Sequence, residues 1–75
     1  MTLADLKLNQ KCIIKKLNSK GVIHRRFQDL GLISGNVVKC VLISPFKNPK
    51  AFWVNGIILA IRNEDSKLIE VDLFE

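Results

Sequence analysis

The sequence has 75 residues, 48% of them apolar and 25% charged, a composition typical of one small folded domain (residues 1–75) that excludes a disordered chain. A chain this short buries only about 60% of the surface that it exposes when unfolded, so a large catalytic pocket would cost too much stability, and we expect no enzyme. The formal net charge is +5, and no apolar run approaches the length of about 18 residues that a transmembrane helix needs.

The first third of the chain predicts a helical turn, a strand and a helix. Residues 2–5 have the capping-box spacing of a hydroxyl and an acid three positions apart. Residues 11–17 are β-branched at their centre and predict a strand. Residues 22–30 carry an apolar stripe at helical spacing, and Gly31 follows where a left-handed C-cap would end the helix.

The middle of the chain predicts the longest strand and an exposed loop. Residues 37–43 are rich in Val and Ile, and Lys39 marks the face toward solvent. Strict alternation then places Ile43 beside Lys39 on that outer face and Leu42 on the opposite face. Residues 44–50 contain two prolines and form a loop, in which Phe46 is the one large apolar residue.

Asn55-Gly56 joins two apolar runs, residues 51–54 and 57–61, and predicts a hairpin with a tight type I′ turn. Both faces of this hairpin are apolar. One face fills the core, and the other carries Trp53 with Ile58 and Ala60. We favour coverage of this second face by the helix and the N-terminal turn; if it is exposed, it marks a protein-binding surface.

The last segments predict a polar turn over residues 63–66 and a fifth strand over residues 68–73. Five short strands with one helix after the first favour a mostly-β fold. We expect a small SH3-like five-stranded barrel with one inserted α-helix, because closure reduces the exposed edges of such a sheet. An OB-like barrel is the alternative.

Metal and catalytic motifs are absent from the sequence. Cys12 and Cys40 lie in predicted strands, where we expect them to be buried thiols rather than ligands. His24 is the only histidine and would supply at most a weak site, so no metal-binding residue is assigned. The N-terminus carries an acid at Asp5 where a secretory signal would be basic, so we expect a cytoplasmic protein without a cofactor.

The positive charge is concentrated in the first two-thirds of the chain. Residues 1–50 hold ten basic and two acidic side chains, and such a surface attracts nucleic acid, an anionic membrane face or an acidic protein. Among the five aromatic residues we expect only Phe46 and Trp53 to be exposed, which is a thin stacking platform for single strands. Nucleic-acid binding is therefore the alternative function and not the preferred one.

The chain resembles the FeoA family. The residues that carry the resemblance are Gly21, the run 25–32 (Arg-Arg-Phe-Gln-Asp-Leu-Gly-Leu), Ser34-Gly35, Ser44-Pro45, Pro49, Asn55-Gly56 and the run 59–62. The resemblance implies an SH3-like barrel that serves as a cytoplasmic accessory protein of bacterial ferrous iron transport beside FeoB, a membrane permease with a GTP-binding domain. It also implies transition-metal binding, for which this sequence offers no evident ligand set.

The resulting hypothesis is a regulatory protein that contacts FeoB and has no catalytic activity. The partner-binding candidates are the cations Arg25, Arg26, Lys15 and Lys16 and the apolar residues Phe46 and Trp53. Charge would steer the encounter and the apolar anchors would hold it. A basic nucleic-acid-binding barrel and a weak transition-metal module remain the alternatives, and self-association stays open.

Overall fold

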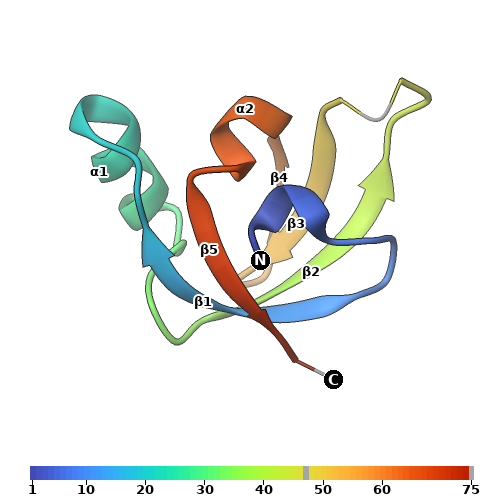
Figure 1. The fold of residues 1–75 in the computed structure, drawn as a ribbon, viewed down its shortest axis with the longest axis horizontal. Helices are drawn as coiled ribbons and strands as arrows, with labels where there is room; N and C mark the ends of the chain where they lie inside the picture. The colour runs from blue at the N-terminus through green and yellow to red at the C-terminus, as the bar shows by residue number, and fades with distance from the viewer. Residues whose placement is uncertain (47, 75) are drawn as a thin grey trace.

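The computed structural model describes residues 1–46 and 48–74, in which five strands pair in the order β4-β3-β2-β1-β5 (Figure 1). Every neighbouring pair is antiparallel, the sheet is strongly curved, and β5, the last strand in the sequence, pairs directly with β1, the first. The strands are β1 (Lys11–Leu17), β2 (Val37–Ile43), β3 (Lys50–Val54), β4 (Ile57–Ile61) and β5 (Ile69–Leu73). The predicted five strands and the helix after the first are confirmed.

The helix α1 (Gly21–Asp29) ends as its sequence predicts. Gly31 has a φ of +98°, and its N–H donates to the carbonyl of Gln28 at 3.1 Å. The N–H of Leu32 donates to the carbonyl of Phe27 at 2.9 Å, and the Leu32 side chain is buried. These two bonds form a Schellman motif, which satisfies the last carbonyls of the helix.

Two shorter helices flank the sheet. The 3-10 turn η1 (Leu3–Asp5) follows the predicted capping box, in which the Asp5 carboxylate accepts from the Thr2 N–H at 3.0 Å. Residues 63–66 were predicted as a polar turn, but they form the short helix α2 (Asn63–Ser66). The Arg62 carbonyl accepts the Ser66 N–H at 2.9 Å, and the acids Glu64 and Asp65 lie in the first turn, where the helix dipole favours them.

The core lies inside the curled sheet and under η1. Its largest fully buried side chain is Phe52, and Phe27 of α1 closes one side at 7% exposure. Cys12 and Cys40 are buried free thiols, as predicted. The remaining members of the cluster are Leu3, Leu6, Ile14, Leu32, Val38, Val54, Ile61, Ile69 and Val71.

A β-bulge in β2 overturns the alternation predicted for that strand. Cys40 pairs with Phe52, but the next paired residue, Leu42, faces Ala51, so one residue of β2 is extra. The insertion reverses the faces of the strand beyond it. Leu42 is therefore 61% exposed, and Ile43 packs against the core instead of sharing the outer face with Lys39.

Candidate functional site

The helix α1 and the edge strand β4 enclose an apolar groove of about 340 Å³. The stripe predicted on α1 forms one wall, with Ile23 and Leu30 beside the buried Phe27, and Arg26 lies at the rim. The opposite wall is Leu59, Ala60 and Ile61 of β4. Such a groove fits an apolar side chain of a partner, with the Arg26 guanidinium free to meet a carboxylate at its edge.

A second surface lies on the outer face of the sheet, where one row of side chains crosses four strands. Lys11 of β1 is opposite Lys39 of β2, Lys39 is opposite Trp53 of β3, and Trp53 is opposite Ile58 of β4. We call these four residues the Trp53 row. The side chain of Trp53 is 43% exposed and that of Ile58 is 66% exposed, so coverage of this face, which we favoured from the sequence, is wrong.

Phe74 extends the same surface beyond Lys11. Its N–H donates to the Lys11 carbonyl at 2.9 Å, and its side chain is 45% exposed, whereas the sequence predicted only Phe46 and Trp53 to be exposed among the aromatic residues. Phe74, Trp53 and both lysines of the row line a shallow hollow of about 380 Å³ with Val37 and Val41. Only the strand register brings Phe74 to this place, so the sequence carried no signal for it.

The predicted partner-binding residues do not form one surface. Arg25 and Arg26 are exposed on α1, and Phe46 is 91% exposed in the β2–β3 loop, at the opposite end of the view in Figure 1. Trp53 lies on the outer face of the sheet. Lys15 and Lys16 are exposed on β1.

The cations of β1 are partly neutralised by acids of β5. Lys15 Nζ lies 3.9 Å from Asp72 Oδ1. The Glu70 carboxylate accepts from Asn18 Nδ2 at 2.6 Å, which lowers the pKa of Glu70, and Lys16 and Lys15 lower it further. Lys11, Lys39, Arg25 and Arg26, by contrast, form no ion pair with any carboxylate of residues 1–46 and 48–74.

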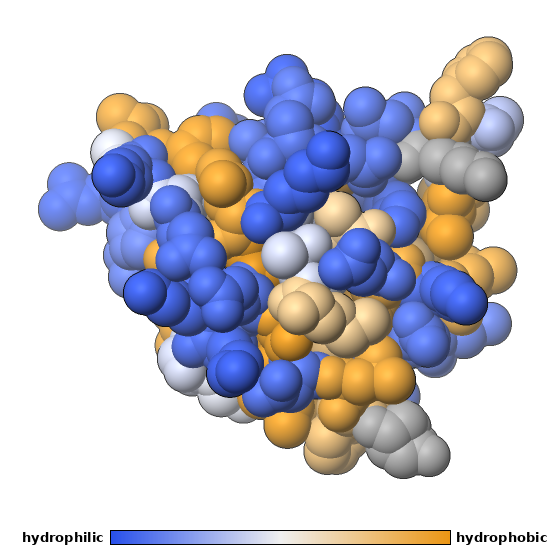
Figure 2. Space-filling view, in the orientation of Figure 1, coloured by the Kyte–Doolittle hydropathy of each residue, from blue (hydrophilic) through white to orange (hydrophobic). Residues whose placement is uncertain are grey.

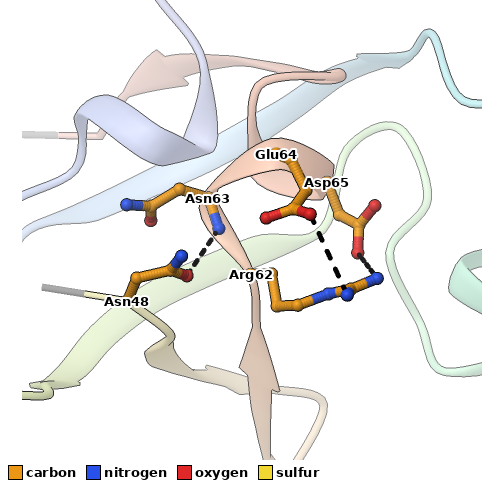
Figure 3. A network of polar contacts seen from close by, with 5 residues as sticks. All are labelled: Asn48, Arg62, Asn63, Glu64 and Asp65. Atoms are coloured by element: carbon orange, nitrogen blue, oxygen red, sulfur yellow. Dashed lines mark hydrogen bonds and ion pairs between the residues drawn. The ribbon is translucent and has the colours of Figure 1, made fainter.

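A polar network ties the β2–β3 loop to α2 (Figure 3). Asn48 Oδ1 accepts from the Asn63 N–H at 3.1 Å, and the Asn48 N–H donates to Ser44 Oγ at 3.0 Å. Arg62 forms two ion pairs: its Nη1 lies 3.9 Å from Glu64 Oε2, and its Nη2 lies 3.6 Å from Asp65 Oδ2. The base of the loop is thus anchored, and the charge of Arg62 is offset by its own neighbours.

The described part of the chain holds no group of three or more His, Cys, Asp and Glu side chains arranged around a common point. His24 Nδ1 lies 3.2 Å from the Ser19 hydroxyl oxygen. Burial raises the pKa of the Cys12 thiol to about 11, so this side chain is held as a neutral thiol and not as a thiolate ligand. Within the same residues no helix is long and apolar enough to cross a membrane.

Comparisons with known proteins agree with this architecture. The family model of the FeoA domain matches residues 1–73. A Porphyromonas gingivalis Fe(2+) transport protein A/Fe(2+) transporter FeoB fusion protein is 26% identical over 97% of this chain, which spans only 9% of that protein.

Two solved structures are similar over nearly the whole chain. The FeoA protein of Chlorobium tepidum has a TM-score of 0.94 at 27% identity, with 100% of this chain and 71% of that one covered. The FeoA of Stenotrophomonas maltophilia complexed with zinc, a prokaryotic SH3 domain protein, has a TM-score of 0.85 at 28% identity. The match covers 96% of this chain and 89% of that one. The SH3-like barrel prediction is therefore confirmed over the OB-like alternative.

Proposed function

The chain belongs to the FeoA family, which is associated with ferrous iron transport, and from this membership we propose that it docks on the cytoplasmic side of the FeoB permease and regulates it. The observation that carries the proposal is the fusion protein of P. gingivalis, in which a part similar to this chain and a FeoB transporter are one polypeptide. A fusion holds its two parts at a high effective concentration, which is useful when the separate proteins act together.

The groove between α1 and β4 supports docking of a protein segment. Its walls are apolar, and Arg26, which pairs with no carboxylate of residues 1–46 and 48–74, lies at the rim. Apolar surface beside an arginine is the combination that dominates binding energy at protein interfaces. Arg25 is exposed one position away on the same helix and adds positive charge beside the groove. Charge of this kind speeds the encounter, and the apolar walls slow dissociation.

The proposed action is contact rather than catalysis. The apolar groove and the hollow beside Trp53 support contact with a partner, and His24 is the only histidine in the sequence that would supply an imidazole for acid–base work. We propose that docking biases the conformational state of the permease, because a ligand shifts such an equilibrium by the difference in its affinity for the two states.

The test is the affinity of the protein for full-length FeoB of the same organism, reconstituted in lipid discs. Arg26→Glu reverses the charge at the rim of the groove, and we expect about tenfold weaker binding. Lys67→Glu makes the same charge change at an exposed site next to α2 and serves as the matched control. Leu30→Ser removes apolar surface from the α1 wall of the groove without a change of charge and should weaken binding as well.

Two results would contradict the proposal at different levels. If wild type does not bind FeoB at low salt, the docking function is wrong. If wild type binds and both Arg26→Glu and Leu30→Ser bind equally well, docking is retained but the groove is not its site.

A further inference from the structure

The half of the sheet made of β2, β3 and β4 has cations but no carboxylate. No acidic residue occurs between Asp29 and Glu64, a segment that contains these three strands and both loops between them. Exposed large apolar side chains are nevertheless frequent on its outer face and on the β2–β3 loop: Leu42, Phe46, Trp53 and Ile58 are 61%, 91%, 43% and 66% exposed. We call these four residues, together with Lys11 and Lys39, the acid-free face.

The two lysines of the acid-free face are arranged unfavourably for the stability of the sheet. Lys11 and Lys39 are directly opposite each other in neighbouring strands, a position in which like charges repel. No carboxylate of the described residues neutralises either of them. Their repulsion would be relieved by an external anion on the outer face of the sheet.

The loop next to this face presents an apolar side chain to solvent. The β2–β3 loop projects from the body of the molecule in Figure 1, and a hydrophobic projection is visible at the same place in Figure 2. Phe46 is almost fully exposed there, while the Asn48 bonds to Ser44 and Asn63 hold the base of the loop. Phe46 adds to the exposed apolar residues Leu42, Trp53 and Ile58, and exposed apolar surface of this kind marks contacts with a partner or a membrane.

We propose that the acid-free face docks on an anionic lipid surface, with Phe46 and Trp53 in the interfacial layer and Lys11 and Lys39 against the lipid phosphates. Aromatic rings concentrate at the headgroup level of bilayers, and lysines next to them are attracted by anionic lipids. The contact is peripheral and involves no helix insertion. This goes beyond the proposed contact with the permease and uses a different set of residues from the groove.

The spacing of the aromatic residues favours lipid over single-stranded nucleic acid. Trp53 and Phe74 are separated by two strands, β2 and β1, whose residues in the same row are the cations Lys39 and Lys11. Successive bases of a single strand stack on successive aromatic rings, and here no ring lies between Trp53 and Phe74 in this row. The intervening side chains are Lys11 and Lys39, and the other apolar members of the face, Leu42 and Ile58, have no ring for a base to stack on.

Trp53 is itself the probe for the test. It is the only tryptophan and the sequence has no tyrosine, so the intrinsic fluorescence of the protein reports on this face alone. The full chain is titrated with vesicles of equal parts phosphatidylglycerol and phosphatidylcholine, with vesicles of phosphatidylcholine alone, and with a thymidine oligonucleotide. We expect a blue shift and co-sedimentation with the anionic vesicles only. Both should be lost near 1 M NaCl, where the Debye length is about 3 Å.

Single substitutions assign the binding to the acid-free face. Lys39→Glu should weaken partitioning onto anionic vesicles about tenfold, and Phe46→Ser should weaken it without a change in its salt dependence. Arg25→Glu makes the same charge change on α1 and should bind like wild type. Circular dichroism checks that each variant is folded; Arg25 and Phe46 are exposed, and Lys39 is half-buried.

The proposal is overturned if anionic vesicles leave the Trp53 emission unchanged, if Lys39→Glu partitions like wild type, or if the oligonucleotide produces the larger shift. These outcomes are independent of the permease experiment. Lys39→Glu is expected to retain FeoB binding measured in detergent, and Arg26→Glu is expected to retain vesicle binding.

Discussion

Gly31 and Asn55 are in such close contact that a Cβ built on the glycine would lie 3.0 Å from the asparagine Nδ2 and 3.3 Å from its Cβ. Gly31 ends α1, and Asn55 begins the tight turn between β3 and β4 with a φ of 54°. A hydrogen bond also secures this helix end, because Asn36 Nδ2 donates to the Gly31 carbonyl at 2.7 Å. The contact therefore fixes where α1 lies relative to β4, and so the width of the groove.

Replacing Gly31 should destabilise the fold for two separable reasons. Gly31→Ala forces an L side chain into a positive φ, which costs about 1–2 kcal/mol, and adds a clash with Asn55 that costs about another 1 kcal/mol. Gly35→Ala is the control, since Gly35 has a φ of +94° and open space around its Cβ position. Urea unfolding should show a larger loss of stability for Gly31→Ala than for Gly35→Ala. Adding Asn55→Gly to Gly31→Ala should recover only the part of the loss that the clash causes. Equal losses for the two alanine variants would contradict it.

Lys50 anchors the N-terminal turn. Its Nζ donates to the carbonyl oxygens of Ala4 at 2.6 Å and Leu6 at 3.1 Å, in a partly buried position. Lys50→Met keeps the aliphatic stem but leaves both carbonyls without this donor, and we expect a loss of about 1.5–3 kcal/mol in the free energy of unfolding. Lys7→Met at an exposed site should change it by less than about 0.5 kcal/mol. Similar values for the two variants would show that the bonds contribute nothing net.

Lys39 is expected to reduce the stability of the isolated protein. Because it faces Lys11 directly, Lys39→Glu converts a repulsive cross-strand pair into an attractive one and should raise the free energy of unfolding by about 0.2–1 kcal/mol at low salt. The same change is expected to weaken vesicle binding, so stability and binding should move in opposite directions. Thermal unfolding at low and high NaCl measures the effect, and a stabilisation that does not shrink with salt would exclude charge as its cause.

The protein should lose stability at alkaline pH because of Cys12. Burial, with a smaller contribution from the nearby Cys40, raises the pKa of this thiol from 9.0 to about 11. Between these pH values the folded state holds a proton that the unfolded chain has lost, so stability is full below pH 9 and falls as pH rises toward 11. Urea unfolding from pH 7 to 10.5 should show a steeper decline for wild type than for Cys12→Ala. Parallel profiles would refute a role for this thiol.

Local signals in the sequence were sufficient for most of the secondary structure. Asn55-Gly56 fixes a hairpin because both central residues of that turn need positive φ, and Gly31 ends a helix for the same reason. The bulge in β2 was not predictable, because an extra residue in a strand is set by the partner strand and leaves no mark in the alternation. α2 was missed because four residues are too few for a periodic pattern.

The surfaces depend on pairing between distant segments, and this limited their prediction. Exposure of Phe46 followed from its proline-rich loop and is confirmed. The juxtaposition of Lys11, Lys39 and Trp53 required the register of three strands, and Phe74 required the position of β5 beside β1. Arg25 and Arg26 were identified through the family resemblance, and their contact with a partner stays a prediction.

The pairing of β5 with β1 has a consequence for biosynthesis. The N–H of Val71 donates to the carbonyl of Met1 at 3.0 Å, and Thr2 bridges to Glu70, so β5, which is synthesised after the other four strands, holds residues 1 and 2. The sheet therefore closes only after residues 69–73 have left the ribosome. Until then the nascent chain exposes part of its apolar core to chaperones and proteases. This exposure ends when β5 pairs with β1.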